Sequence, residues 1–300
     1  MMKDFIIITG GDAAYFPLIE ELLQSIADSA PNGLTVPLGL IDAGLTDAQK
    51  QTLAARGVQI VSPPWEHDIS PLKHRNRLYL RANLGKVFLP KYFPQYQTLI
   101  WLDADAWVQD WAAVELLYQG AQTGALTICP QSGRYFKVDV PVRWWLGPLN
   151  SVRSINFKNA SRAGLPWRIC QALALKPTLN AGAYALQATA PHWAAMQRWQ
   201  EKIIKKGRLF TSDQLAMALA THYEGLPLHY LPEWCNYMGP WRMDAETRTL
   251  VEYYLPFRKI GFVHLAGLDA MRRDETETLP VADLAGREVQ LSLRYKAWRK

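Results

Sequence analysis

The 300-residue sequence predicts a single α/β domain built on an open, largely parallel sheet. Apolar, β-rich runs alternate with helical segments over the first 130 residues, which is the pattern of such sheets. The run 99–102 is continuously apolar, as in a strand covered on both faces. Polar residues follow two of these runs, at 10–12 and at 103–105. Because ligands of such sheets bind beyond the carboxyl ends of the strands, we expect the functional site there.

The first half of the chain divides into strands and helices in alternation. The first helix places its apolar residues with a period of 3.6, and the second begins with Thr46 as its N-cap and ends before Gly57. The predicted strands cover residues 5–11, 34–42, 58–64 and 97–108, and the predicted helices cover residues 16–28, 46–56 and 78–93.

Residues 131–176 interrupt this alternation, and we expect them to form a long excursion on one side of the site. Regular patterns return with a strand at 178–187, helices at 191–206 and 211–223, and a short strand at 261–267. The helix at 211–223 opens at Thr211 or Ser212. The predicted domain spans residues 1–270, in two halves at 1–130 and 177–270, and a basic tail follows at 271–300.

The composition indicates an enzyme-sized protein of a reducing compartment. Hydrophobic residues make up 49% of the chain, which is enough for a sizeable core. No apolar run is long enough to span a bilayer, and the first residues lack the features of a signal peptide. Cys129, Cys170 and Cys235 lie far apart and predict neither a zinc site nor a disulfide framework. We therefore expect a cytoplasmic location.

The net charge of +6 is concentrated in two segments. Residues 134–176 carry eight basic residues against Asp139 alone, and aromatic residues lie among them: Tyr135, Phe136, Trp144, Trp145, Phe157 and Trp167. We expect this segment to meet an anionic glycan or a lipid-linked diphosphate acceptor. The C-terminal tail, with Leu293, Tyr295 and Trp298, is expected to contact an anionic membrane surface peripherally. Solvated faces are the alternative for both. No nucleic-acid-binding fold is recognisable, so no nucleic-acid partner is expected.

Asp103 and Asp105 are the strongest chemical signal in the sequence. Two unpaired carboxylates at the end of a buried strand would be costly, so a positive group is expected near them. An Asp-x-Asp pair at a strand end suits a hard divalent cation, Mn²⁺ or Mg²⁺, which keeps open positions for phosphate oxygens. The alternative is that both aspartates cap turns or pair with Arg or Lys.

Five segments resemble the GT-A glycosyltransferases, in particular the retaining family 8 that includes bacterial lipooligosaccharide galactosyltransferases and glycogenin. The matching segments are "ITGGDAAYFPLIEELLQSI", "YLRANLGKVFLPKYFPQYQTLIWLDADAWV", "LNAGAYAL", "TSDQLAMAL" and "VHLAG", in family order over residues 6–267. The resemblance implies a Rossmann-like GT-A fold with a mostly parallel sheet. It also implies that 1–130 is the nucleotide-sugar half and that 131–176 lies on the acceptor side.

The resemblance also implies roles for individual residues. The metal ion, Mn²⁺ or Mg²⁺, would be bound by Asp103, Asp105 and His264. Asp12 and Tyr15 would hold the nucleotide base, and Asp213 and Gln214 would act at the transferred sugar. The remaining donor-binding positions are Thr9, Arg81, Asp103, Ala104, Asn180, Ala181, Gly182 and Gly267. We expect Lys86, one turn beyond Arg81, on a solvated face.

The chain departs from the family pattern after His264. The family carries a diphosphate-binding lysine three residues after the glycine of His-x-x-Gly, and this chain has Ala270 there. Arg272 or Arg273 would have to replace it.

These features favour a metal-dependent hexosyltransferase that uses a UDP-sugar donor and, from the family resemblance, retains the anomeric configuration. The acceptor is expected to be a cell-surface glycan precursor or a lipid-linked molecule. Two alternatives stay open. A sugar-phosphate nucleotidyltransferase shares the layout, although "TGGDAAYFP" lacks the basic residues of its phosphate loop. A nucleotide-sugar-binding protein without turnover would explain Ala270.

Overall fold

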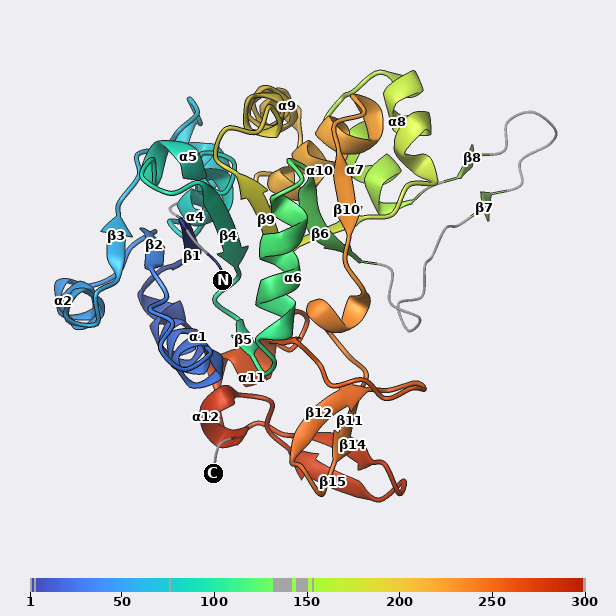
Figure 1. Cartoon of the computed structure of the whole chain (residues 1–300). Helices are drawn as coiled ribbons and strands as arrows, with labels where there is room; N and C mark the ends of the chain where they lie inside the picture. The colour runs from blue at the N-terminus through green and yellow to red at the C-terminus, as the bar shows by residue number, and fades with distance from the viewer. Residues whose placement is uncertain are drawn as a thin grey trace.

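The computed structural model describes residues 2, 4–75, 77–131 and 154–298, together with the backbone of residues 142–143 and 151–152. A seven-stranded sheet forms its centre, in the order β10-β6-β9-β4-β1-β2-β3 (Figure 1). Its strands are β1 (Phe5–Gly11), β2 (Leu38–Asp42), β3 (Gln59–Val61), β4 (Thr98–Leu102), β6 (Leu126–Pro130), β9 (Leu179–Gln187) and β10 (Leu228–Tyr230). Several residues of the predicted excursion lie outside the described part of the chain, namely Arg134, Tyr135, Phe136, Trp144 and Trp145.

The shorter strands lie outside this sheet. They are β5 (Ala106–Val108), β7 (Val142–Arg143), β8 (Ser151–Val152), β11 (Trp241–Asp244), β12 (Thr249–Glu252), β13 (Phe262–His264), β14 (Leu279–Asp283) and β15 (Glu288–Leu291). Strands β12, β11, β14 and β15 form a four-stranded sheet below the main one in Figure 1, and β5 pairs with β13.

The helices occupy both faces of the central sheet and the end of the chain. They are α1 (Phe16–Ser29), α2 (Asp47–Ala55), α3 (Pro71–His74), α4 (Leu80–Gly85), α5 (Leu89–Tyr92), α6 (Ala112–Ala121), α7 (Ile155–Arg162), α8 (Trp167–Ala174), α9 (His192–Lys206), α10 (Ser212–Ala218), α11 (Asp269–Arg273) and α12 (Tyr295–Trp298). Short 3₁₀ or π turns are η1 (Ala13–Tyr15), η3 (Leu219–Tyr223) and η4 (Glu233–Cys235).

The mostly parallel sheet that the sequence predicts is confirmed. β1 runs parallel to β2 and β4, and β6 runs parallel to β10. Only β9 is reversed, since it pairs antiparallel with both β4 and β6. This reversal brings the amino end of β9 to the edge where β1 and β4 end, so segments far apart in sequence meet there.

Alternate residues of the strands build two apolar layers. Phe5 and Ile7 of β1 pack with α1 and α6 on one face, whereas Ile6 and Ile8 pack with α4, α5 and α7–α10 on the other. Every residue of β4 is buried, as its continuous apolar sequence predicts.

Two predicted elements are each divided in the structure. The predicted helix 78–93 consists of α4 and α5, and α5 begins anew with Pro90 in its first turn. The predicted strand 97–108 breaks at Asp103, whose carbonyl accepts a hydrogen bond from the Ala106 amide at 3.0 Å. The turn directs β5 away from the main sheet to pair with β13.

The expected membrane contact of the C-terminal segment is wrong for its apolar residues. Leu293, Tyr295 and Trp298 are all buried, because α12 packs against α1 and the preceding strands complete the four-stranded sheet. Among the described residues, no helix is long and apolar enough to cross a membrane.

A buried ion pair fixes this C-terminal segment to α1. Arg294 is 3% exposed, and its guanidinium donates to the Glu21 carboxylate and to the backbone carbonyls of Met271 and Arg272. The Tyr295 hydroxyl adds a hydrogen bond to Asp28. The segment is therefore anchored to α1 by these contacts.

Replacing Arg294 with Met should lower the free energy of unfolding by about 3–5 kcal/mol, because it leaves the Glu21 carboxylate buried without its cation. Urea unfolding followed by circular dichroism measures the change. The control is Arg198→Met, since both Arg198 and its partner Glu224 are partly exposed to solvent. A loss of the same size in both variants would contradict the role assigned to Arg294.

Candidate functional site

A cavity of about 610 Å³ opens at the carboxyl ends of β1 and β4. Gly10 and Gly11 line it from β1, and the 103–105 turn lines it from β4. The amino end of β9, the first turn of α10 and the segment after β13 complete the wall. The position agrees with the edge at which the sequence predicts a site.

The two aspartates of the 103–105 turn point into this cavity and are partnered differently. Asp103 Oδ1 accepts hydrogen bonds from Lys86 Nζ and from Trp101 Nε1, both at 2.7 Å. Asp105 Oδ2 accepts one from Arg272 Nη1 at 2.7 Å. The sequence predicts a positive group beside these two carboxylates. Lys86 is that group for Asp103, and Arg272 is that group for Asp105.

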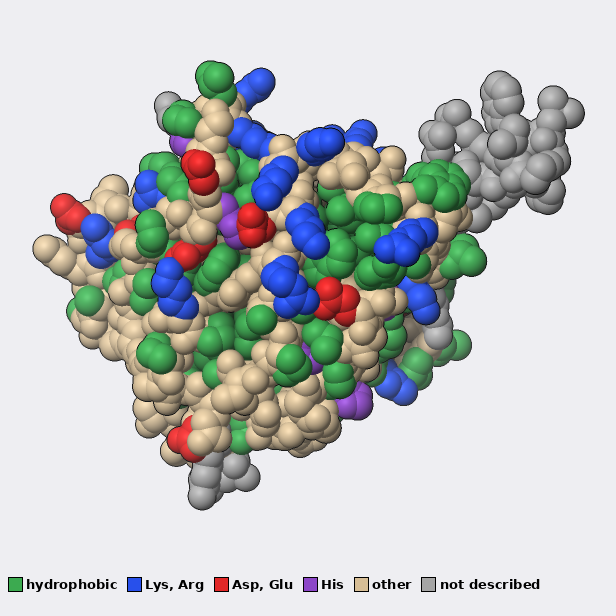
Figure 2. Space-filling model, turned by 90° about the horizontal axis from the view of Figure 1, so that it is seen from above, with side chains coloured by type: hydrophobic (Ala, Val, Ile, Leu, Met, Phe, Trp, Pro, Cys, Tyr) green, Lys and Arg blue, Asp and Glu red, His purple; other side chains and the backbone are tan. Residues whose placement is uncertain are grey.

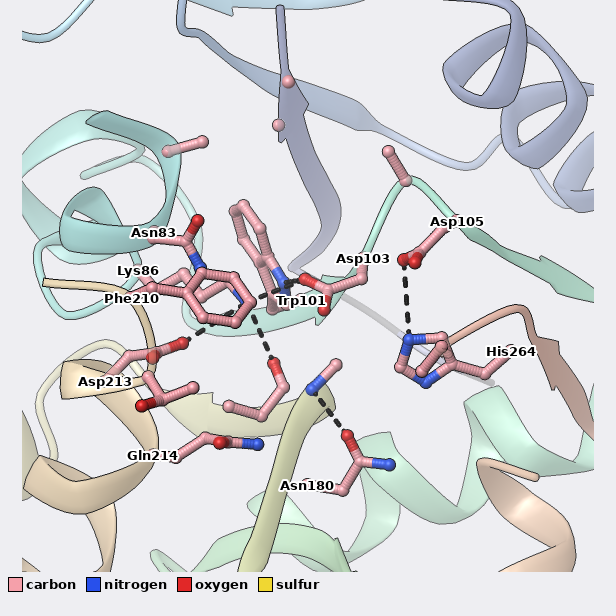
Figure 3. Close-up of a pocket in the computed structure, with 18 of the residues that line it drawn as sticks. Asn83, Lys86, Trp101, Asp103, Asp105, Asn180, Phe210, Asp213, Gln214 and His264 are labelled. Atoms are coloured by element: carbon pink, nitrogen blue, oxygen red, sulfur yellow. Dashed lines mark hydrogen bonds and ion pairs between the residues drawn. The ribbon is translucent and has the colours of Figure 1, made fainter. Parts of the chain in front are cut away.

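The prediction of a solvated Lys86 is wrong. This side chain is buried, and its ammonium group lies 2.7 Å from Asp103 Oδ1 and 3.3 Å from Asp213 Oδ2 (Figure 3). Burial opposes the charge, but the Asp103 and Asp213 carboxylates outweigh it, so the pKa of Lys86 is raised. Lys86 follows α4 with helical dihedral angles, φ −53° and ψ −28°, so its side chain lies on the same face as Ala82 and Asn83, which also line the cavity.

Asp213 shares this ammonium group from the opposite wall of the cavity. It lies in the first turn of α10 and is 2% exposed. Burial raises the pKa of its carboxyl, although the charge of Lys86 acts against the increase. Thr211 precedes this helix in a left-handed conformation and makes no side-chain cap. The Asp213 carboxylate is held by the Lys86 ammonium group at 3.3 Å and by the Gln214 backbone amide.

His264 lies beside Asp105 because β13 pairs with β5, with His264 opposite Ala106. Its Nε2 atom is 3.4 Å from Asp105 Oδ1, and its Nδ1 atom is 3.0 Å from Asn236 Oδ1. Burial opposes protonation of His264, but Asp105 raises the pKa of the imidazole. Burial also disfavours the charged Asp105, whereas His264 and Arg272 lower the pKa of that carboxyl well below its usual range.

Asp103, Asp105 and His264 form a donor set that fits a divalent cation. One ligand atom from each residue lies within 4.8 Å of the other two. Two carboxylates and an imidazole suit Mn²⁺ or Mg²⁺, and the hydrogen bond to Asn236 orients the histidine as in metal sites.

Gly182 leaves room for this histidine. A Cβ atom at Gly182 would lie 2.3 Å from His264 Cε1. The Gly182 carbonyl accepts a hydrogen bond from the Asp103 amide at 2.7 Å, and its amide donates to Asn180 Oδ1 at 3.0 Å. The Asn-Ala-Gly segment thus lies directly against the aspartate turn.

Most of the predicted site residues line the cavity, but three do not. Those that do are Tyr15, Asp103, Ala104, Asp105, Asn180, Ala181, Gly182, Asp213, Gln214, His264 and Gly267. Thr9 is buried within β1, and Asp12 caps the η1 turn that carries Tyr15. Arg81 lies over the Trp65 ring at 5.5 Å, outside the lining.

Sequence reasoning missed several lining residues, and it did not distinguish Arg272 from Arg273. Arg272 lines the cavity, whereas Arg273 is absent from the lining. The lining residues without a sequence signal are Tyr79, Asn83, Trp101, Gln131, Phe210 and Met238. The one hint that the sequence offered is the polar Asn83, which directly follows the buried Ala82 in the same helix.

Replacing Lys86 with Met should destabilise the fold by about 3–5 kcal/mol at pH 7, because two carboxylates lose their cation. Loss of the positive charge raises the pKa of Asp213 further. At pH 7 the buried Asp213 carboxylate is then ionised without its cation, which costs stability, and this cost disappears once Asp213 is protonated below its raised pKa. The deficit should therefore shrink as the pH falls from 7 to 4. Lys86→Arg is the control that keeps the charge. A pH-independent deficit in urea unfolding would contradict this assignment.

Comparison with known proteins identifies the fold. No protein-family model and no curated protein matches the sequence. The galactosyltransferase LgtC, solved with donor and acceptor sugar analogs, superposes with a TM-score of 0.51 over 87% of each chain at 14% identity. An active-site mutant of LgtC gives the same values. The bifunctional glycosyltransferase WbbM gives a TM-score of 0.55 at 12% identity over 89% of this chain and 46% of its own. The chain therefore has the GT-A fold that its sequence motifs predict.

Proposed function

We propose that this protein is a metal-dependent glycosyltransferase that moves a hexose from a UDP-sugar to a glycan or lipid-linked acceptor. The convergence of Asp103, Asp105 and His264 in the cavity is the observation that carries this proposal. The shared fold of LgtC, whose structure contains donor and acceptor sugar analogs, supports it. We infer that the protein acts in the cytoplasm on a precursor of a cell-surface glycan.

The metal site would use both aspartates and the histidine. A bound Mn²⁺ or Mg²⁺ would act as a Lewis acid that stabilises charge on the diphosphate leaving group. His264 is held for this role by Asn236, and the Asp105 oxygen that faces the histidine is not the one that Arg272 contacts.

Arg272 would grip the diphosphate in place of the lysine that the family carries. Its guanidinium already lies in the cavity wall beside Asp105, and a guanidinium offers paired donors to phosphate oxygens. Tyr15 would contact the base, with Asp12 fixing the turn that carries it. Ala104 and Gly267 would shape the donor site, Gly267 with its backbone at a positive φ of 83°.

Asn180, Asp213 and Gln214 would act on the transferred sugar. Both side chains line the cavity, Asn180 from β9 and Asp213 from α10, and offer an amide and a carboxylate to the sugar hydroxyls. Asp213 is held by Lys86, which favours an orienting role over nucleophilic attack. Retention of configuration would then proceed on the front face, with the leaving phosphate taking the acceptor proton.

The test is release of UDP from UDP-galactose, UDP-glucose and UDP-N-acetylglucosamine, with Mn²⁺, with Mg²⁺ and with chelator. We expect release from one donor, dependent on metal, and at least a hundredfold slower in Asp105→Asn, because that change removes a charged ligand. Asp47→Asn is the matched control, since its carboxylate is exposed on α2.

The alternatives give different outcomes in the same assay. Binding of UDP-sugar without release would indicate a nucleotide-sugar-binding protein, which the engagement of Asp105 by Arg272 allows. Formation of a UDP-sugar from sugar phosphate and UTP would indicate a nucleotidyltransferase.

Replacing Gly182 with Ala should weaken Mn²⁺ binding about 10–100-fold, because the added methyl group meets His264 and displaces the imidazole. Calorimetry without nucleotide measures the affinity. Gly124→Ala, at an open surface turn, serves as the control for loss of a glycine. Unchanged Mn²⁺ affinity in Gly182→Ala would remove His264 from the metal site.

A further inference from the structure

A basic and partly apolar surface lies outside the cavity, on the side of the molecule where α9 ends. We define this basic face by seven cationic residues, Lys73, Arg75, Arg162, Arg168, Lys205, Lys206 and Arg208, and three apolar ones, Leu72, Trp167 and Phe210. Figure 2 views the molecule from the side of α9 and shows many Lys and Arg side chains in blue beside hydrophobic ones in green. The face combines α3, the end of α9 and the α7–α8 region.

Side-chain contacts join the three parts of the basic face. Lys73 Nζ donates to the carbonyls of Ile204 and Lys205, so α3 lies against the end of α9. A Cβ atom at Gly164, between α7 and α8, would lie 3.0 Å from Lys206 Cδ. Arg162 and Arg208 line one small depression together. These contacts place α3, the end of α9 and the α7–α8 region side by side.

The charge of this face is almost unopposed. Segments 71–75, 155–174 and 200–211 contain a single acidic residue, Glu201. Among the seven cationic residues, only Lys205 has an ion pair within the described part of the chain, at 3.2 Å from Glu201. Clustered cations without carboxylates repel one another, and an anionic surface that meets them would relieve this repulsion.

Large apolar side chains project from the same face. Leu72 is 86% exposed, Trp167 is 62% exposed and Phe210 is 53% exposed. Trp167 packs edge-on against Phe157, so one side of its ring is supported and the rest faces solvent. Exposed Trp, Phe and Leu among Lys and Arg are the combination that enters the headgroup region of a bilayer.

We propose that the basic face docks this protein onto a bilayer that contains anionic lipids. The inference rests on the proposed function, because it names a membrane as the place where the acceptor is met. Phe210 belongs both to the face and to the cavity wall, and Thr211 follows it there. Docking by this face therefore sets the mouth of the cavity close to the lipid surface, where the head of a lipid-linked acceptor lies.

The experiment is flotation with vesicles of phosphatidylcholine alone and with 30% phosphatidylglycerol, at physiological salt. The full-length protein should bind the anionic vesicles and not the neutral ones, and binding should weaken as salt increases. The variant Lys206→Glu/Arg208→Glu should bind at least tenfold more weakly. The variant Leu72→Ser/Trp167→Ser should lose severalfold, because less apolar surface enters the bilayer.

Matched controls come from the opposite end of the molecule in Figure 1. Arg258→Glu/Lys259→Glu changes the same number of charges beside β12, and Leu255→Ser removes a side chain that is 72% exposed there. Both control variants should bind the anionic vesicles like the unmodified protein. Thermal unfolding checks that every variant keeps its fold.

Three outcomes would overturn the proposal. The first is no binding to anionic vesicles, and the second is an equal loss in the control variants. The third is binding to a DNA duplex at least as tight as to the vesicles, and equally sensitive to the same substitutions, which would assign the face to nucleic acid. UDP release in solution, measured on the same variants, should not change. Loss of vesicle binding with intact release therefore separates this inference from the proposed function.

Discussion

The site depends on one buried ammonium group. Lys86 contacts the Asp103 carboxylate at the end of β4 and the Asp213 carboxylate in the first turn of α10. Without this ammonium group, the two carboxylates would repel each other. The Lys86 carbonyl is fixed in turn by the Tyr184 hydroxyl of β9 at 2.6 Å. Lys86 therefore joins β4, α10 and the reversed strand β9. The shape of the cavity depends on its position.

The protein holds its cavity in a charge-compensated state. Lys86 neutralises Asp103, and Arg272 neutralises Asp105, so neither carboxylate is buried without a partner. A metal cation bound with an anionic diphosphate would take the aspartates as its ligands, and the diphosphate would take the positive side chains Lys86 and Arg272. All of these groups are already in position. Little reorganisation is then required, which is the usual basis of electrostatic preorganisation.

The sequence predicts the sheet, its edge and the aspartate pair, because these follow from periodicity and from the placement of polar residues after apolar runs. It does not predict the partners of the aspartates. The charge of Lys86 indicates a surface residue, but Lys86 lies one helical turn after Ala82 and on the face that lines the cavity, where two carboxylates from distant segments accept its charge. The burial of Trp298 depends on a docking surface on α1, which no local pattern reveals. Long-range packing decides both.

The pairing of β5 with β13 also determines when, during translation, the residues of the candidate site can come together. Asp103 and Lys86 lie 17 residues apart, so they can meet while the first half of the chain leaves the ribosome. Asp105 can meet its partners only later, because Arg272 lies 167 residues further on and His264 lies in β13, shortly before Arg272. A chain that ends before β13 lacks both His264 and Arg272, so it has no complete candidate cation site. The proposed metal chemistry therefore requires residues from both halves of the sequence.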